Sequence, residues 1–312
     1  MITRFLWAVS THARACLILG LLAGLLLPGL AGMLVVWLPQ MVALLLTTTA
    51  LRIGHRAAVG AMRDLRWGLG AVVVLQVMVP LSLLGLLVLA DLQMTPAALA
   101  IVLACAAPAI TGSVNLALIM RLDAGRMMQI LVLGTAAFPL TVLPVLFFLP
   151  QLGPADQVIL SALKLLAVIA VATAAGFALR VWLFPEPTEA QTKALDGLSV
   201  LAFCVIVVGL MAGLNPALRS DAWVVAQWAL LAFAISYLMQ LFTLLILRRS
   251  ALRGVAGPLA IGAGNRNIAI FLVALPPEVL APLVIFIGCW QLPMYLTPML
   301  LPQLYKWALD ND

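Results

Sequence analysis

Long apolar runs separated by short polar stretches make up most of this chain, and they predict membrane-spanning helices. A spanning helix needs about 20 mainly apolar residues. The first two runs are divided at Pro28-Gly29, because a single helix of that length would exceed the bilayer core. The predicted spans are 15–30, 33–51, 67–89, 97–122, 127–149, 156–182, 195–214, 223–247, 255–275 and 279–304.

Composition supports a polytopic membrane protein. The 312 residues are 65% hydrophobic and 9% charged, whereas soluble domains carry about 25% charged residues. If the N-terminus is cytoplasmic, fourteen of the 17 basic residues lie inside, Arg219 lies outside, and Lys164 and Arg266 lie within spans. This bias predicts ten spans with both termini cytoplasmic, and we expect a bacterial inner membrane location.

Two similar motifs predict an internal repeat. The stretch 112–118 reads GSVNLAL and the stretch 264–270 reads GNRNIAI, and each is followed by two prolines five residues apart. The polar linker 185–196 lies between the two halves, which we place at 1–150 and 151–312. Five spans per half imply opposite topology, as in the inverted repeats of secondary transporters. Coincidental similarity is the alternative.

Spans four and nine are the predicted functional site. Pro108 and Gly112 interrupt one, and Gly262 and Gly264 interrupt the other. Paired interruptions in corresponding spans mark substrate sites in transporters, since broken backbone at membrane depth needs protein or a water-filled cavity around it. The alternative is a pair of kinked structural helices that pack through small residues.

Arg266 is the most unusual residue of these spans. All 11 acidic residues fall in loops or near span ends, so a buried carboxylate relay is not favoured. Arg266 lies near the middle of span nine, where a guanidinium needs partners. Two interpretations stay open: a group that binds or balances an anion, and a structural arginine bonded to helix-end carbonyls.

Several short patterns resemble the bile acid:sodium symporter superfamily over essentially the whole chain. They are Gln76 with Pro80, the stretch PAITGSVN at 108–115, the stretch GAGNRN at 262–267, and Trp290-Gln291. The resemblance implies an all-α polytopic membrane protein with ten transmembrane helices in two inverted five-helix repeats. Discontinuous helices 4 and 9 would cross beside the sodium and substrate sites. Spans 1, 2, 6 and 7 would form a panel domain, and spans 3–5 and 8–10 a core domain.

The resemblance also supplies candidate site residues. The substrate-binding candidates are Arg266, Asn267, Asn265, Asn115, Ser113, Thr111 and Gln291. The ion-binding candidates are Gln76, Ser113 and Asn115, with Arg266 as a cation surrogate. Where the family pattern has a sodium-ligating Glu and a Gln, this chain has Gly262 and Arg266. Hard cations prefer anionic oxygen ligands and like charges repel, so we expect weak or no sodium coupling.

These observations predict a secondary active transporter of a small organic anion, bile-acid-like or another carboxylate or sulfonate, that works by alternating access. The alternatives are a sodium-coupled symporter, an efflux carrier of related plan, and a non-transporting membrane receptor. We expect no enzyme, because His12 and His55 fall in predicted cytoplasmic segments and no carboxylate lies mid-span. The expected partners are membrane lipid and the anion, not nucleic acid. We expect no metal site and no cofactor, with Na⁺ left open, and a monomer or weak homo-oligomer.

Overall fold

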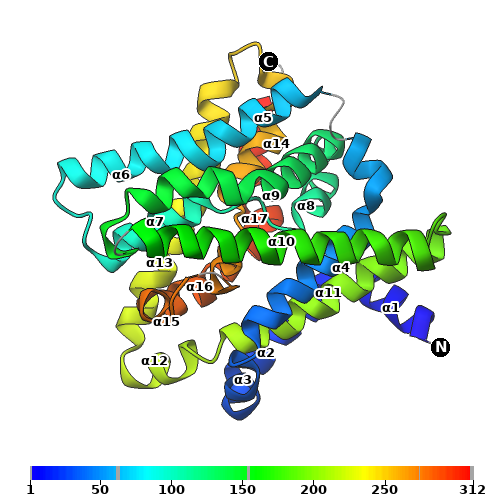
Figure 1. Cartoon of the computed structure of the whole chain (residues 1–312), viewed down its shortest axis with the longest axis horizontal. Coiled ribbons are helices and arrows are strands. Elements are labelled where there is room, and N and C mark those ends of the chain that lie inside the picture. The colour runs from blue at the N-terminus through cyan, green and yellow to red at the C-terminus, as the bar shows by residue number, and fades with distance from the viewer. Residues whose placement is uncertain (1, 61–63, 153–154, 274, 310–312) are drawn as a thin grey trace. The chain divides into compact units, whose positions relative to one another are not determined.

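The computed structural model describes residues 2–60, 64–152, 155–273 and 275–309 (Figure 1). Within these ranges every regular element is a helix, and the one β-type pairing is an isolated bridge. Six helices are long and apolar enough to cross a membrane, or eight if each of two bent pairs forms one span. The chain is therefore an integral membrane protein by the length and composition of its helices. The ten-span inverted repeat and the orientation of the termini stay predictions.

The six long apolar helices coincide with predicted spans three, five, six, seven, eight and ten. Pro80, Pro139 and Pro144 lie inside them without ending them, as happens where neighbouring groups satisfy the freed backbone. The six helices are Leu65–Leu89, Ala124–Phe147, Asp156–Leu183, Glu189–Ser220, Ala222–Leu247 and Pro277–Leu300.

The first two predicted spans are bent and have different boundaries from those expected. The predicted break is present, since α2 (Ala13–Leu26) ends just before α3 (Pro28–Val35) begins. A second break precedes α4 (Leu38–Gly60), where the axis bends by 77°. Its physical reason is Pro39, which has no N–H to continue the helical bonding. Helix α1 (Ile2–Thr11) precedes α2 at 88°.

Predicted spans four and nine are interrupted, as expected. Helix α7 (Pro96–Ala106) stops before Pro108, and the chain resumes as α8 (Ser113–Ile119). Helix α14 (Arg253–Gly264) stops before Asn265, and a 3₁₀ helix η4 (Ile268–Val273) follows. Residue 274 of predicted span nine lies outside the described residues.

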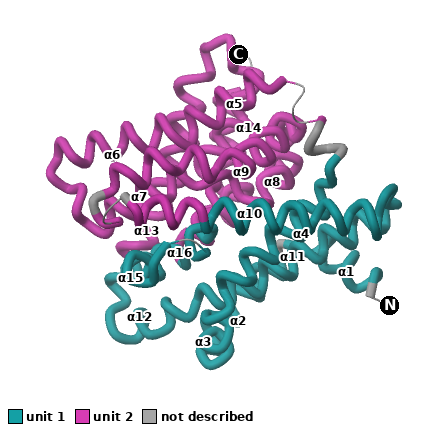
Figure 2. The backbone as a smooth tube through the Cα atoms, viewed as in Figure 1, with its two compact units in different colours: residues 1–59, 164–226, 269–288 teal, residues 60–163, 227–268, 289–312 magenta. Residues whose placement is uncertain are grey.

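The chain divides into two compact units, each drawn from both halves of the sequence (Figure 2). Unit 1 comprises 1–59, 164–226 and 269–288, and unit 2 comprises 60–163, 227–268 and 289–312. The inverted repeat (1–150 and 151–312) and the panel and core domains stay predictions.

In unit 1, α11 (Glu189–Leu210) packs against α1, α2 and α3. Small residues permit this close approach: a Cβ on Gly20 would lie 2.5 Å from Cys204 Sγ. Asn215 donates its amide to the Gly24 carbonyl at 2.7 Å. The remaining elements of unit 1 are most of α4, α12 (Leu214–Ser220), most of α10 (Ala155–Leu183), most of η4, α15 (Pro277–Leu280), η5 (Ala281–Leu283) and most of α16 (Val284–Cys289).

In unit 2, α9 (Ala124–Phe147) packs against α5 (Leu65–Val73), α7, α8 and α14. Because α7, α8 and α14 belong to the two interrupted spans, both of these spans pack against the long helix α9. The remaining elements of unit 2 are η2 (Val74–Met78), α6 (Val79–Leu89), η3 (Pro150–Leu152), most of α13 (Ala222–Leu247), α17 (Gln291–Leu300) and α18 (Pro302–Leu309).

Candidate functional site

The two interrupted spans meet through their backbones inside unit 2. Ala109 and Arg266 form an isolated antiparallel bridge. The Ile110 N–H donates to the Asn265 carbonyl at 2.9 Å, and the Asn267 N–H donates to the Pro108 carbonyl at 2.8 Å. Each break therefore satisfies backbone groups that the other has freed, as membrane depth requires.

The Arg266 side chain is buried at this bridge, with 2% of its surface exposed. Its guanidinium donates to three backbone carbonyls. Nε bonds the Ala263 oxygen at 2.9 Å, Nη1 bonds the Ala107 oxygen at 3.0 Å, and Nη2 bonds the Leu75 oxygen at 2.9 Å. These are the helix-end carbonyls that one interpretation of the sequence proposed.

Each of the three carbonyls is available for a local reason. In an α-helix the Ala263 oxygen would accept from the Asn267 N–H, which here bonds Pro108 instead. The Ala107 oxygen lies just past the last turn of α7, where the helix has ended. The arginine thus replaces helical donors that the two breaks removed.

The Leu75 carbonyl is freed by a proline. It lies in the π-helical turn η2, where Val79 donates to Val74, five residues back. In the same register Leu75 would accept from residue 80, and Pro80 has no N–H. The Leu75 oxygen is therefore left for the guanidinium.

The charge of Arg266 is also favourably placed. The C-terminal ends of α7 and α14 carry the negative ends of their helix dipoles, and a cation is stabilised there. The observed hydrogen bonds account for how a guanidinium is tolerated in this buried position. Direct contact of Arg266 with an anion stays a prediction.

Two more buried side chains hold the second break in place. The Trp290 indole N–H donates to the Arg266 carbonyl at 2.9 Å. The Asn265 amide donates to the Ile261 carbonyl at 3.1 Å, and its oxygen accepts from the Thr297 hydroxyl at 3.2 Å. Both ends of the Asn265 side chain are therefore used inside the protein. Its predicted contact with substrate stays a prediction.

Sequence reasoning missed a polar network that extends from this break. The Ser236 hydroxyl donates to the Gly264 carbonyl at 2.8 Å. The Gln240 amide donates to the Thr297 hydroxyl at 3.4 Å, and the Gln240 oxygen accepts from the Tyr305 hydroxyl at 2.7 Å. The available signal was Ser236 and Gln240 four residues apart in an otherwise apolar span, which places both on one helix face.

Gln76, the predicted ion ligand, is buried against α9. Its side-chain oxygen accepts from the Thr141 hydroxyl at 2.7 Å. A Cβ on Gly134 would lie 2.6 Å from its amide nitrogen, so that glycine makes room for it. Gln76 follows Leu75, whose carbonyl bonds Arg266, so two of the four predicted ion-site residues, Gln76 and Arg266, are linked through one π-helical turn.

The candidates of the first break differ in exposure. Ser113 is fully buried, and its hydroxyl has no hydrogen-bond partner within the described part of the chain. Thr111 and Asn115 are partly exposed, and α8 packs against α14. Asn267 and Gln291 are buried. All eight predicted site residues belong to unit 2, and their roles stay predictions.

Gly262, where the family pattern of the resemblance has a glutamate, has apolar surroundings. A Cβ on Gly262 would lie 3.3 Å from Ile130 Cγ2 and 3.7 Å from Leu75 Cδ1. Across the described ranges, no group of three or more His, Cys, Asp or Glu side chains is arranged to hold a metal ion. The oxygen atoms that gather around positive charge at this site are the three carbonyls bonded by Arg266.

No protein-family model and no curated protein matches this chain.

Proposed function

We propose that this membrane protein is a secondary active transporter of small organic anions, of the bile acid:sodium symporter type, and that it works by alternating access. The observation that carries the proposal is Arg266, a buried cation where two interrupted helices meet. Interrupted helices at mid-membrane are how secondary transporters build substrate and ion sites. The division of the chain into two compact units, each taken from both halves, supports the proposal.

Arg266 acts as a permanent counter-ion in place of sodium. Backbone carbonyl oxygens are ligands that a hard cation prefers, and here three of them accept from the guanidinium. A sodium ion beside this charge would be repelled in a medium of low dielectric. Transport therefore proceeds without obligatory sodium coupling.

The substrate binds at the partly exposed start of α8. Thr111 and Asn115 supply hydrogen-bond donors there. Ser113 adds a hydroxyl whose bonding capacity is unused among the described residues. The Arg266 charge favours an anion in this low-dielectric region without contacting it. A carboxylate or sulfonate fits these requirements.

The test is counterflow in proteoliposomes. Purified protein is reconstituted into liposomes, which are loaded with one of a panel of unlabelled carboxylates and sulfonates, one bile acid included. Uptake of the same anion in labelled form is then measured in a sodium buffer and in a choline buffer. We expect counterflow of equal size in both salts, and its loss in Asn115→Ala. Strict sodium dependence would overturn the counter-ion role. Binding without counterflow would overturn transport and favour a receptor.

A further inference from the structure

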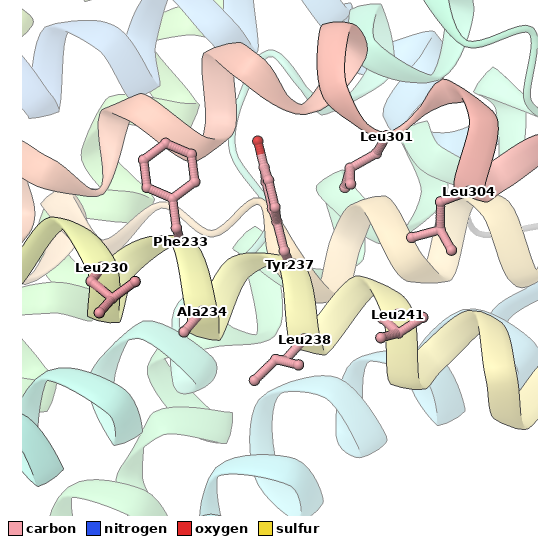
Figure 3. Close-up of a pocket in the computed structure, with 8 residues that line it drawn as sticks. All are labelled: Leu230, Phe233, Ala234, Tyr237, Leu238, Leu241, Leu301 and Leu304. Atoms are coloured by element: carbon pink, nitrogen blue, oxygen red, sulfur yellow. The ribbon is translucent and has the colours of Figure 1, made fainter.

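An apolar groove runs along α13 in unit 2 (Figure 3). Its volume is about 470 Å³, within the range of ligand sites. Leu230 lies at one end, and Leu241 and Leu304 lie at the other. Phe233 and Tyr237 form one wall, with their rings edge to face at 5.5 Å. The Tyr237 hydroxyl is directed to α17, where it donates to the Pro293 carbonyl at 3.4 Å. The rest of the lining is aliphatic.

The length of the groove matches a lipid tail. From Leu230 to Leu241 the helix rises by about 16 Å at 1.5 Å per residue. One leaflet of a bilayer core of about 30 Å is about 15 Å deep. An acyl chain that enters at Leu241 and Leu304 would therefore extend along the whole groove to Leu230.

Basic side chains lie beyond this end of the groove. Arg248 directly follows the last residue of α13, and its N–H still donates to the Leu244 carbonyl at 2.8 Å. It is seven residues after Leu241, so it lies on the same helix face about 10 Å further on. Its guanidinium stacks over the Trp307 ring at 4.5 Å, which ties the end of α13 to α18. Lys306 and Arg249 are exposed beside this pair in the sequence. The stretches 227–268 and 289–312 contain five basic residues and two acidic ones, Asp310 and Asp312, so their net charge is positive.

We infer that this groove binds an anionic phospholipid, with one acyl chain along α13 and the phosphate at Arg248, Arg249 and Lys306. The exposed tryptophan suits the headgroup level, where aromatic rings concentrate. Charge complementarity selects the headgroup, because basic clusters at the membrane surface attract anionic lipids. Because the lining is apolar, the groove favours the acyl chain of a lipid over a soluble phosphate compound.

The test is native mass spectrometry of the full chain, extracted from vesicles that contain equal amounts of phosphatidylglycerol and phosphatidylcholine. We expect retention of phosphatidylglycerol in preference to phosphatidylcholine. Arg249→Gln and Lys306→Gln should each lower the retained phosphatidylglycerol about fivefold, from the typical contribution of one basic residue. Arg219→Gln, an exposed arginine in unit 1, is the matched control and should change nothing.

A second pair of variants tests the groove itself. Ala234→Phe fills it and should lower retention of both lipids, whereas Ala170→Phe on the exposed face of α10 should not. Equal retention of the two lipids, or an equal loss in Arg219→Gln, would overturn the headgroup assignment. Unchanged retention in Ala234→Phe, or full competition by soluble glycerol 3-phosphate, would overturn the acyl-chain assignment. A dimer that Ala234→Phe converts to monomer would assign the groove to a second copy instead.

Discussion

Replacing Arg266 by methionine should destabilise unit 2. The change removes three hydrogen bonds from a charged donor to buried carbonyls, each worth about 1.5–3 kcal/mol. It also relieves the cost of holding a guanidinium at the predicted depth of span nine, about 2.5–3.5 kcal/mol. The net loss is therefore about 1–6 kcal/mol of the free energy of unfolding.

The assay is unfolding of purified protein in mixed micelles, with the free energy of unfolding extrapolated linearly from the denaturant series. Lys164→Met is the matched control, because Lys164 is a second cation within a predicted span, but its exposed side chain lies near the span end and is long enough to keep the ammonium group in water. The free energy of unfolding of this variant should be within about 0.5 kcal/mol of that of the native chain. The free energy of unfolding of Arg266→Lys should lie between those of the native chain and Arg266→Met. An ammonium group keeps the charge but lacks the planar guanidinium that reaches three acceptors.

Added sodium separates a counter-ion from a merely structural arginine. In Arg266→Ala the carbonyls of Leu75, Ala107 and Ala263 are left facing an empty volume. If the arginine replaces an ion, sodium should stabilise this variant and not the native chain. A sodium concentration ten times its Kd would add about 1.4 kcal/mol. The reasoning is refuted if Arg266→Met unfolds like the native chain, or if Lys164→Met costs as much. If sodium stabilises Arg266→Ala and the native chain equally, the counter-ion role is refuted, but the structural role of Arg266 is not.

Three further predictions concern single contacts. The Arg126 hydrogen bond lowers the pKa of Asp64 below its usual 3.8. This ion pair therefore stabilises the fold above that pH, and the stabilisation is lost as the pH falls below about 4. In Asp64→Asn this contribution to the acid dependence of the melting temperature should disappear. Thr297→Val should cost about 1–2 kcal/mol of unfolding free energy, because the buried hydroxyl that donates to the Pro293 and Asn265 oxygens and accepts from the Gln240 amide is lost. Gly197→Ala should lower the melting temperature, although alanine normally favours a helix, because its Cβ would overlap the backbone of α1.

Matched variants check each of these. Asp91→Asn changes an exposed loop carboxylate and should leave the acid dependence of melting in place. Thr243→Val removes only a hydrogen bond within its own helix, to Met239, and should cost less than Thr297→Val. Gly85→Ala should be neutral or stabilising, since its Cβ would meet open space. A control that behaves like its partner contradicts the contact assigned to that partner.

The interruptions of the two spans could be predicted from sequence because their causes are local. Pro108 removes a donor, and Gly112 and Gly264 weaken helix continuity. The burial of Arg266 was indicated by the apolar runs around it. Its three acceptors could not be predicted, because they come from residues 75, 107 and 263, which only the tertiary fold brings together.

Other features were out of reach for the same reason. The 77° bend before Leu38 falls inside an apolar run that reads as continuous, although Pro39 is its cause. The side chains of Asn265 and Thr297 meet across 32 residues of chain, and composition gives no sign of which polar groups pair. Hydropathy locates a buried polar group but not its partner.

The bridge between the two breaks has a consequence for how the chain is made. Residues 109 and 266 are paired in the fold, and they are 157 positions apart in the sequence. At about 5–20 residues per second of synthesis, about 8–30 seconds pass between the appearance of the first partner and that of the second. During this interval the Ile110 N–H and the Pro108 carbonyl lack the partners that they have in the finished fold. The first interrupted span therefore completes its hydrogen bonding only after residue 267 has been synthesised, late in the production of the chain.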